Sequence, residues 1–174
     1  MIVCFSGKAH AGKSTHARLL RQYIQEQGTP ATVLPLAAPV KAPVAGEHDD
    51  GLVKDRDRGD LIVFGTEVVR KIDVNRWITI GILTIQAYFM WRGPNAVVLI
   101  DDTRFRNEIL GLQNTFGDHN VYTVRLTRHV TNITNISERD LDTYPFDYTI
   151  PNADMTISEA QMEVRNAYRH MRRT

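Results

Sequence analysis

A short run near the start of the chain combines two glycines, a lysine and two hydroxyls at close spacing. Gly7 and Gly12 bracket four residues, and Lys13 and Ser14 follow directly. Glycines let a backbone turn its N–H groups toward an anion, and the start of a following helix adds the positive end of its dipole. The run also stands behind an apolar stretch, "IVCF". This combination is the pattern of a loop that holds nucleotide phosphates.

Each residue of this loop has an expected task. Lys13 is expected to reach the β and γ phosphates, and Ser14 is expected to coordinate Mg²⁺. Thr15 can support the α phosphate. The predicted ATP-binding residues are Gly7, Ala9, Ala11, Gly12, Lys13, Ser14 and Thr15.

A second group with chemical potential follows another apolar run, "AVVLI". Asp101 and Asp102 stand at its end, and Arg104 and Arg106 come directly after. A carboxylate at the end of a buried strand beside a phosphate loop fits a magnesium-binding element. The predicted metal-binding residues are therefore Ser14, Asp101 and Asp102, and the sequence does not decide between the two aspartates. The rigid fork of arginine suits phosphate, so Arg104 is a candidate for holding the phosphate of an acceptor.

The stretch "FGTEVVRKIDVNRW" has two interpretations. Glu67 and Arg70 are three residues apart and would share a helix face, and Arg76 and Trp77 begin the next predicted helix. A carboxylate, arginines and an indole can hold a nucleotide's base, sugar and phosphate. A surface ion pair beside a core tryptophan fits the same residues, and the sequence leaves both interpretations open.

The elements that must position these residues alternate between strand and helix. Short, nearly continuous apolar runs predict buried strands at 2–5, 32–36, 96–100 and 121–126. Helical patterns lie at 17–24, 74–91, 109–116 and 158–171, with Gly28, Asp73, Gly93-Pro94 and the Ser158/Gln161 pair as end signals. This alternation predicts an α/β fold with a central parallel sheet flanked by helices. Ligands of such sheets gather at the carboxyl ends of the strands.

Composition narrows the class of protein. The 174 residues are 43% hydrophobic, which suits one domain with a real core, and the net charge of +1 excludes a polybasic or acidic protein. The only cysteine, Cys4, forms no internal disulfide and is expected to be a small buried hydrophobe in a reducing compartment. The apolar stretch 77–91 is interrupted by polar residues and is shorter than the ~20 residues of a membrane span. We expect a cytoplasmic protein without a membrane partner.

Two polar segments interrupt the alternation, at 46–60 and 128–142. They are either ordinary surface loops or segments that close over a substrate.

The order of these motifs resembles that of the bacteriophage-type deoxynucleoside monophosphate kinases, within the P-loop nucleotide kinases. The matching pieces are "GKAHAGKST", "LAAPVK", "FGTEVVRKIDVNRW", "VLIDDTRFRNE", "HVTNITNISERDLD" and "FDYTIPNAD". The resemblance implies a P-loop NTPase fold with a mobile lid, in one kinase domain over residues 1–174. Within it, it implies an acceptor-binding insertion at about 37–92 and a lid at about 128–142. It also implies transfer of the γ-phosphoryl group of ATP, with Mg²⁺, to a deoxynucleoside monophosphate.

The resemblance also assigns roles to individual residues. On the acceptor side it implies Lys41, Glu67, Arg70, Trp77 and Arg104. As catalytic residues it implies Lys13, the strand-end carboxylate Asp102, the arginine Arg104 and the lid cations Arg128 and Arg139. The pair Ala37-Ala38, where the family often has an aromatic before the alanine, and a lid with few arginines are departures that bear on the acceptor's identity.

Other functions fit the same residues. A P-loop kinase acting on hydroxymethylated bases within phage DNA would use the basic C-terminal helix to contact phosphates, although a solvated helix face fits the same residues. These basic residues are Arg165, Arg169, His170, Arg172 and Arg173. A nucleotide-hydrolysing switch or binding module is a further alternative, although no Asn-Lys-x-Asp signature of guanine specificity occurs. A kinase of a small metabolite is another. The accepted base is not readable, a homodimer is compatible with the sequence, and a phage-encoded protein would work in the host cytoplasm.

Overall fold

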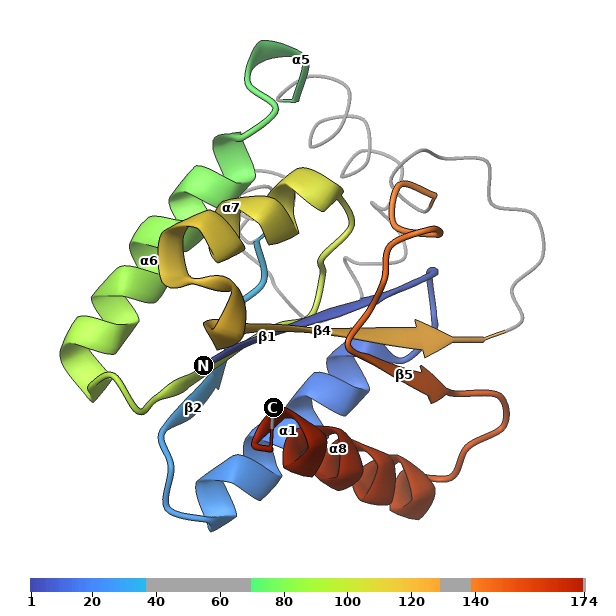
Figure 1. The fold of residues 1–174 in the computed structure, drawn as a ribbon. Helices are drawn as coiled ribbons and strands as arrows, with labels where there is room; N and C mark the ends of the chain where they lie inside the picture. The colour runs from blue at the N-terminus through green and yellow to red at the C-terminus, as the bar shows by residue number, and fades with distance from the viewer. Residues whose placement is uncertain (37–69, 129–138, 174) are drawn as a thin grey trace, which may run out of the picture.

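The fold is built on a five-stranded sheet of order β2–β3–β1–β4–β5, in which every neighbouring pair is parallel (Figure 1). It is taken from a computed structural model that describes residues 1–36, 70–128 and 139–173. The strands are β1 (Ile2–Gly7), β2 (Ala31–Val33), β3 (Val97–Ile100), β4 (Val121–Thr127) and β5 (Tyr148–Pro151). The central position of β1 puts the loop that follows it at the middle of the carboxyl edge.

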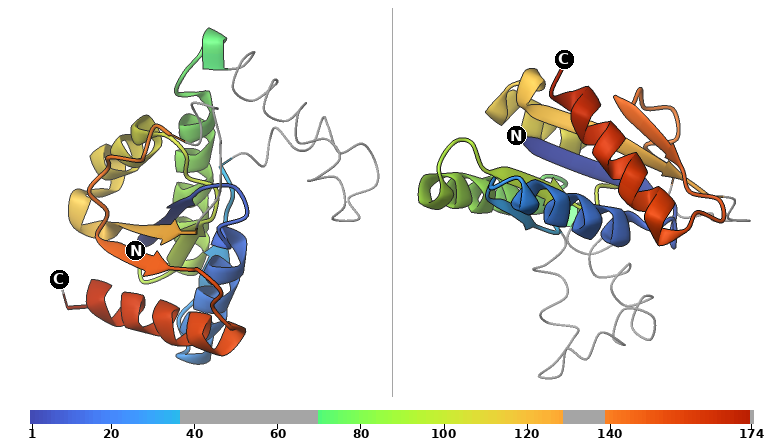
Figure 2. Two further views of the ribbon diagram at one scale, coloured as in Figure 1. Left: turned by 90° about the vertical axis from the view of Figure 1, so that its right-hand side faces the viewer. Right: turned by 90° about the horizontal axis from the view of Figure 1, so that it is seen from below.

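Helices cover both faces of this sheet. They are α1 (Lys13–Glu26), the single turn α5 (Arg70–Ile72), α6 (Arg76–Arg92), α7 (Arg106–Phe116) and α8 (Ile157–Met171), with a 3-10 turn, η2, at Asp118–Asn120. Figure 2 shows α1 and α8 side by side, while α6 and α7 lie on the opposite side of the sheet. The predicted α/β fold with a central parallel sheet between helices is confirmed.

The alternation of side chains along β1 explains the two layers. Val3 and Phe5 pack with α1 and α8, whereas Ile2 and Cys4 pack with α6 and α7. All four are at most 1% exposed. A strand that is apolar on both faces must be covered on both, which is why its sequence is continuously apolar instead of alternating.

Several predicted boundaries shift in the structure. The run 32–36 pairs in the sheet only as Ala31–Val33, and β5 was not predicted as a separate strand. The helix expected from about residue 74 begins at Arg76, because the Asp73 carboxylate accepts from the amide of Asn75 and holds a turn before it. The predicted cap of the last helix, Ser158 with Gln161, is wrong. Thr156 and Glu159 form the capping box, two residues earlier.

The single thiol belongs to the core. Cys4 is 1% exposed, and its burial raises the pKa of the thiol to about 12. A thiol that stays protonated is a poor nucleophile, so Cys4 acts as the small buried hydrophobe that the sequence predicts. None of the helices in the described ranges has the length and apolar character that a membrane crossing requires.

Candidate functional site

The chain segments that leave the sheet at its carboxyl edge bring the candidate residues together. The phosphate loop follows β1, Asp101 follows β3, Arg128 follows β4 and Asn152 follows β5. Because all five strands are parallel, these four exits lie on one edge of the sheet. This is the edge at which open α/β sheets bind their ligands.

The loop after β1 has the conformation that its glycines predict. Gly12, the residue before α1, has φ +89°, and a Cβ there would lie 2.6 Å from the Asn152 amide nitrogen. A Cβ on Gly7 would lie 2.6 Å from the backbone oxygen of Leu126, which cannot move aside as a side chain can. Both glycines are therefore required by close approach to β4 and β5, and Gly12 also by its left-handed backbone.

Lys13 lies across this loop. Its ammonium donates to the carbonyl of Gly7 at 2.7 Å and to that of Lys8 at 2.8 Å. Lys8 also accepts from the amide of Ala11 at 3.2 Å, so its carbonyl is shared by two donors. The lysine thus closes the turn that surrounds the space where an anion would bind.

Two side chains from neighbouring strand ends hold the outer carbonyls of the loop. The amide of Asn152 donates to the oxygen of Ala11 at 2.7 Å, and the Arg128 guanidinium donates to that of His10 at 3.1 Å. The backbone of Asn152 is fixed in turn, since its N–H donates to Thr127 at 2.8 Å. These two bonds fix the backbone of residues 10 and 11, in a loop of the kind whose N–H groups can form an anion-binding nest.

The candidate metal ligands differ in their surroundings. Oδ1 of Asp102 accepts from the amide of Leu36 at 2.8 Å and so ties the segment after β2 to the end of β3. Asp101 is the first residue after β3 and is half-buried, and Ser14 lies in the first turn of α1. A hydroxyl and carboxylates are hard oxygen donors, the kind that Mg²⁺ prefers. The chemistry of this donor set therefore fits magnesium.

Arg104 stands on a backbone that is fixed by a buried carboxylate. Glu108, 5% exposed, accepts from the amides of Arg104 at 2.8 Å and Phe105 at 3.1 Å. These amides come just before α7, so the glutamate satisfies donors at the start of the helix. The sequence reasoning missed this role, although a glutamate three residues after the start of a helix is its signal.

The other acceptor-side predictions lie on or near α5 and α6. Lys41 and Glu67 fall outside the described residues, and Arg70 is the first residue of α5. Trp77 lies in the first turn of α6 and is 8% exposed. The Asn107 side chain donates to the Val74 carbonyl and to the Asn75 side chain, so the start of α7 is joined to the start of α6.

The predicted lid is described only at its ends. Arg128 and Arg139 are both exposed, and residues 129–138 between them lie outside the described part of the chain. The segment after Arg139 is a turn that runs to Thr143.

An acid in this turn contacts the phosphate loop, and sequence reasoning missed it. The carboxylate of Asp142 forms ion pairs of 2.7 Å with both Lys8 and Arg125, and Arg125 also donates to the Ser6 hydroxyl at 3.1 Å. Desolvation would raise the pKa of Asp142, but the two cations outweigh it and lower this pKa. No local pattern marks these residues, because they come from β1, β4 and a distant turn.

One polar group beside the loop is buried. His16, in α1, is 2% exposed, and its Nδ1 lies 3.0 Å from the Gly12 carbonyl. Its Nε2 is buried and has no hydrogen-bond partner among the described residues. Burial lowers the pKa of His16, so the neutral imidazole is favoured under the loop.

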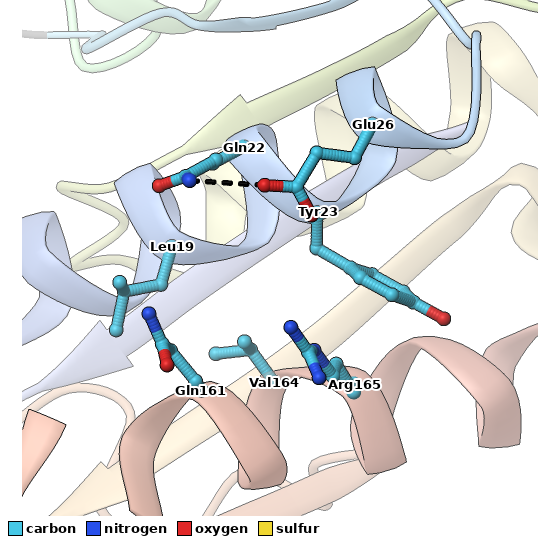
Figure 3. A pocket seen from close by; sticks show the side chains of 7 residues that line it. All are labelled: Leu19, Gln22, Tyr23, Glu26, Gln161, Val164 and Arg165. Carbon is cyan, nitrogen blue, oxygen red and sulfur yellow. Dashed lines mark hydrogen bonds between the residues drawn. The ribbon is translucent and has the colours of Figure 1, made fainter. Parts of the chain in front are cut away.

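A small pocket lies between α1 and α8 (Figure 3). Its lining includes Gln22 and Glu26, which are hydrogen-bonded to each other at 3.0 Å, and Arg165, whose guanidinium lies 5.2 Å from the ring centre of Tyr23. These contacts fill the groove between two packed helices. None of the candidate site residues lines this pocket.

Comparison with known proteins supports the same interpretation of the fold. The APS kinase CysC of Mycobacterium tuberculosis in complex with AMPPNP and APS matches with a TM-score of 0.57 and 15% identity, over 97% of this chain and 96% of that one. A cysteine-to-alanine mutant of the same enzyme matches with a TM-score of 0.54 and 15% identity, over the same shares of the two chains.

A curated protein is similar in sequence as well. The phosphomevalonate kinase of Drosophila melanogaster is 27% identical in an alignment of 134 residues, which covers 72% of this chain and 67% of that protein. No protein-family model matches the chain. The P-loop kinase fold, the phosphate loop and this relative together define an ATP-dependent phosphotransferase.

Proposed function

We propose that this phosphotransferase transfers the γ-phosphoryl group of ATP to a deoxynucleoside monophosphate and forms the diphosphate. The observation that carries the proposal is the common edge that the phosphate loop shares with Asp101 and the segment that leads to Arg104. Such a transfer requires a loop that holds the donor phosphates and, at the same edge of the sheet, an arginine that holds the phosphate of the acceptor. The order of motifs in the sequence supports the deoxynucleotide as the acceptor.

On the donor side, the loop amides and Lys13 would hold the triphosphate. The lysine donates to two loop carbonyls, so its ammonium lies at the loop. Binding of a triphosphate would replace these two carbonyls by phosphate oxygens, which are stronger acceptors for a charged donor. Thr15, next in the sequence, would support the α phosphate.

Mg²⁺ would be held by Ser14 and by Asp101 or Asp102, with ATP phosphates and water as the remaining ligands. When bound, the ion neutralises charge on the β and γ phosphates. Because Asp102 uses Oδ1 on the amide of Leu36, we propose Asp101 as the acid on the metal side and Asp102 as the residue that fixes the segment after β2.

On the acceptor side, Arg104 would orient the incoming phosphate, with its backbone fixed by Glu108. Arg70, Lys41, Glu67 and Trp77 would complete an acceptor-binding region over about 37–92. Arg128 and Arg139, at the ends of a lid over about 128–142, would place positive charge on the transferring group and exclude water. Because phosphoryl transfer passes through a loose transition state, such positioning and charge account for most of the catalysis.

The test is a panel of acceptors with ATP and Mg²⁺, read by the release of ADP. Deoxynucleoside monophosphates are expected to give the highest turnover, and ATP alone should give little. The diphosphate product, identified by mass, distinguishes transfer from hydrolysis. ADP release that no monophosphate accelerates would refute the deoxynucleotide assignment.

A phosphorylated small metabolite is the second candidate acceptor. The similarity to a protein named phosphomevalonate kinase favours it, since that name also specifies an acceptor that carries a phosphate. Phosphomevalonate therefore belongs in the same panel. A hydroxymethyluracil DNA tests the alternative in which the basic residues of α8 contact nucleic acid, and retention on DNA should then weaken steeply with salt.

A further inference from the structure

The turn at 139–143 forms hydrogen bonds and ion pairs with two different parts of the candidate site. Its backbone is closed by a bond from the Asp142 amide to the Arg139 carbonyl at 3.0 Å, and Leu141 is 2% exposed in the core. Two acids flank this buried leucine, Asp140 and Asp142. Because the buried side chain of Leu141 anchors the turn in the core, the backbone beside it holds both carboxylates in place.

Asp142 contacts the phosphate loop, on the donor side of the candidate site. It pairs at 2.7 Å with Lys8, inside the phosphate loop, and at 2.7 Å with Arg125 of β4. The side chains of Lys8 and Arg125 are 25% and 14% exposed and that of Asp142 is 40% exposed, so both pairs are shielded from water mainly on the side of the cation. The carbonyl of Lys8 accepts hydrogen bonds from the Lys13 ammonium and from the Ala11 amide. Lys8 therefore joins Asp142 to the hydrogen bonds within the loop.

Asp140 contacts the start of α7, on the proposed acceptor side of the candidate site. Its carboxylate accepts from the backbone amide of Arg106 at 2.7 Å, and its carbonyl accepts from Nε of the same arginine at 3.1 Å. Arg106 also donates to the hydroxyl of Thr143. Arg106 is the first residue of α7 and stands two positions after Arg104. The same turn therefore fixes the backbone on which the acceptor arginine stands.

We propose that Asp142 and Asp140 are positioning residues that set the distance between the donor loop and the acceptor arginine through the turn at 139–143, which anchors the end of the proposed lid. The Asp142 half rests on the phosphotransferase assignment alone, whereas the Asp140 half also rests on the proposed role of Arg104. In-line transfer requires the donor and acceptor phosphates to be aligned closely. A long lysine side chain in the loop loses its rotamer freedom when it is paired, and this keeps the loop in its binding conformation before ATP arrives.

The test compares Asp142→Asn with Asp140→Asn, and both remove one charge. Asp142→Asn is expected to weaken ATP binding, measured by calorimetry without any acceptor, by about three- to ten-fold, the range for one or two partly exposed ion pairs. Its acceptor KM should stay unchanged. Asp140→Asn is expected to raise the acceptor KM several-fold with the ATP dissociation constant unchanged. Asp142→Glu keeps the charge and should restore most of the ATP affinity.

Glu26→Gln is the matched control, because it removes an exposed acid from the last turn of α1, at the opposite end of that helix from the phosphate loop, and should change neither constant. Thermal unfolding of each variant separates positioning from loss of fold. If Asp142→Asn does not fold, Asp142→Glu is compared with the wild type, and a loss of ATP affinity smaller than three-fold is expected. The proposal is overturned if the two variants raise both constants equally, or if neither changes any constant. If no acceptor in the panel is phosphorylated, the proposed function is refuted. The ATP dissociation constant of Asp142→Asn, measured by calorimetry, would still decide the role of Asp142.

Discussion

The side-chain amide of Asn152 donates a 2.7 Å hydrogen bond to the carbonyl of Ala11, across 141 positions of sequence. Asn152 follows the last strand, and Ala11 lies in the loop after the first. The contact links the segments that follow the first and the last strand at the place where a triphosphate would bind.

Asn152→Ala should therefore weaken ATP binding without abolishing it. The carbonyl of Ala11 would lose its partner and turn freely, and a buried unsatisfied acceptor costs about 1–3 kcal/mol. We expect the ATP dissociation constant to rise about ten-fold, measured by calorimetry. Asn166→Ala, on the exposed side of α8, is the control and should behave as wild type.

The two glycines with positive φ at the ends of α1 should respond differently to alanine. Gly12 has φ +89° and Gly28 has φ +76°, but only an added Cβ at Gly12 meets a neighbour, the Asn152 amide at 2.6 Å. Gly28→Ala should cost about 1 kcal/mol of unfolding free energy, from the backbone alone. Gly12→Ala should cost more and should also reduce ATP affinity. Urea unfolding and calorimetry measure both effects, and equal losses of stability would contradict this explanation.

Lys13→Met should remove most ATP binding and nearly all turnover. The side-chain length is kept, but the ammonium that lies at the loop is lost, and with it one of the positive charges proposed to hold the γ phosphate. We expect a loss of turnover on the order of a hundred-fold or more, in line with removal of one electrostatic stabiliser of a transition state. Arg21→Met, which removes an exposed cation from α1, is the control. Normal phosphotransfer by Lys13→Met would contradict the assignment of the donor site.

His16 should make the protein less stable in mild acid. Its pKa is lowered in the folded state from the ordinary value of 6.5, so the unfolded chain binds a proton first as pH falls. Above pH 6.5 both states are neutral at this residue, and it adds no pH dependence. Below pH 6.5 unfolding becomes more favourable until the folded imidazole also protonates.

Urea unfolding between pH 5 and 7.5 tests this, with His16→Phe, which cannot titrate. The variant should lose stability less steeply than wild type on the acid side. His119→Phe replaces an exposed histidine and should keep the wild-type slope. Identical slopes for His16→Phe and wild type would show that His16 is not the titrating group.

The local parts of the site could be predicted from the sequence, and the distant contacts could not. The spacing from Gly7 to Ser14 is a local pattern, and the apolar run before it gives the strand, so the loop and its place in the fold followed from the residues. Arg104 was singled out as a candidate because it comes four residues after a strand end, and its role stays a prediction. In each case the signal and the structure lie within a few positions of each other.

Asn152, Asp142 and Arg125 carry no such signal. Each is an ordinary polar residue in the sequence, and each gains its role from the order in which the strands pair. β5 escaped prediction because "YTIP" is short and includes a proline, which fits only an edge position. The predicted start of the last helix was two residues too late, because serine is preferred over threonine as an N-cap and Ser158 was chosen. In the structure it is the Thr156 hydroxyl that accepts from the Glu159 amide.

The packing of β1 on both faces has a practical consequence for Cys4, which carries the chain's single thiol. Because this strand is covered above and below, a thiol reagent can reach the sulfur only when the central strand comes out of the sheet. The rate of labelling by such a reagent in native buffer would then report the opening of the whole molecule, without any added probe. Slower labelling in the presence of ATP would give the affinity of the native state for the nucleotide, independently of turnover.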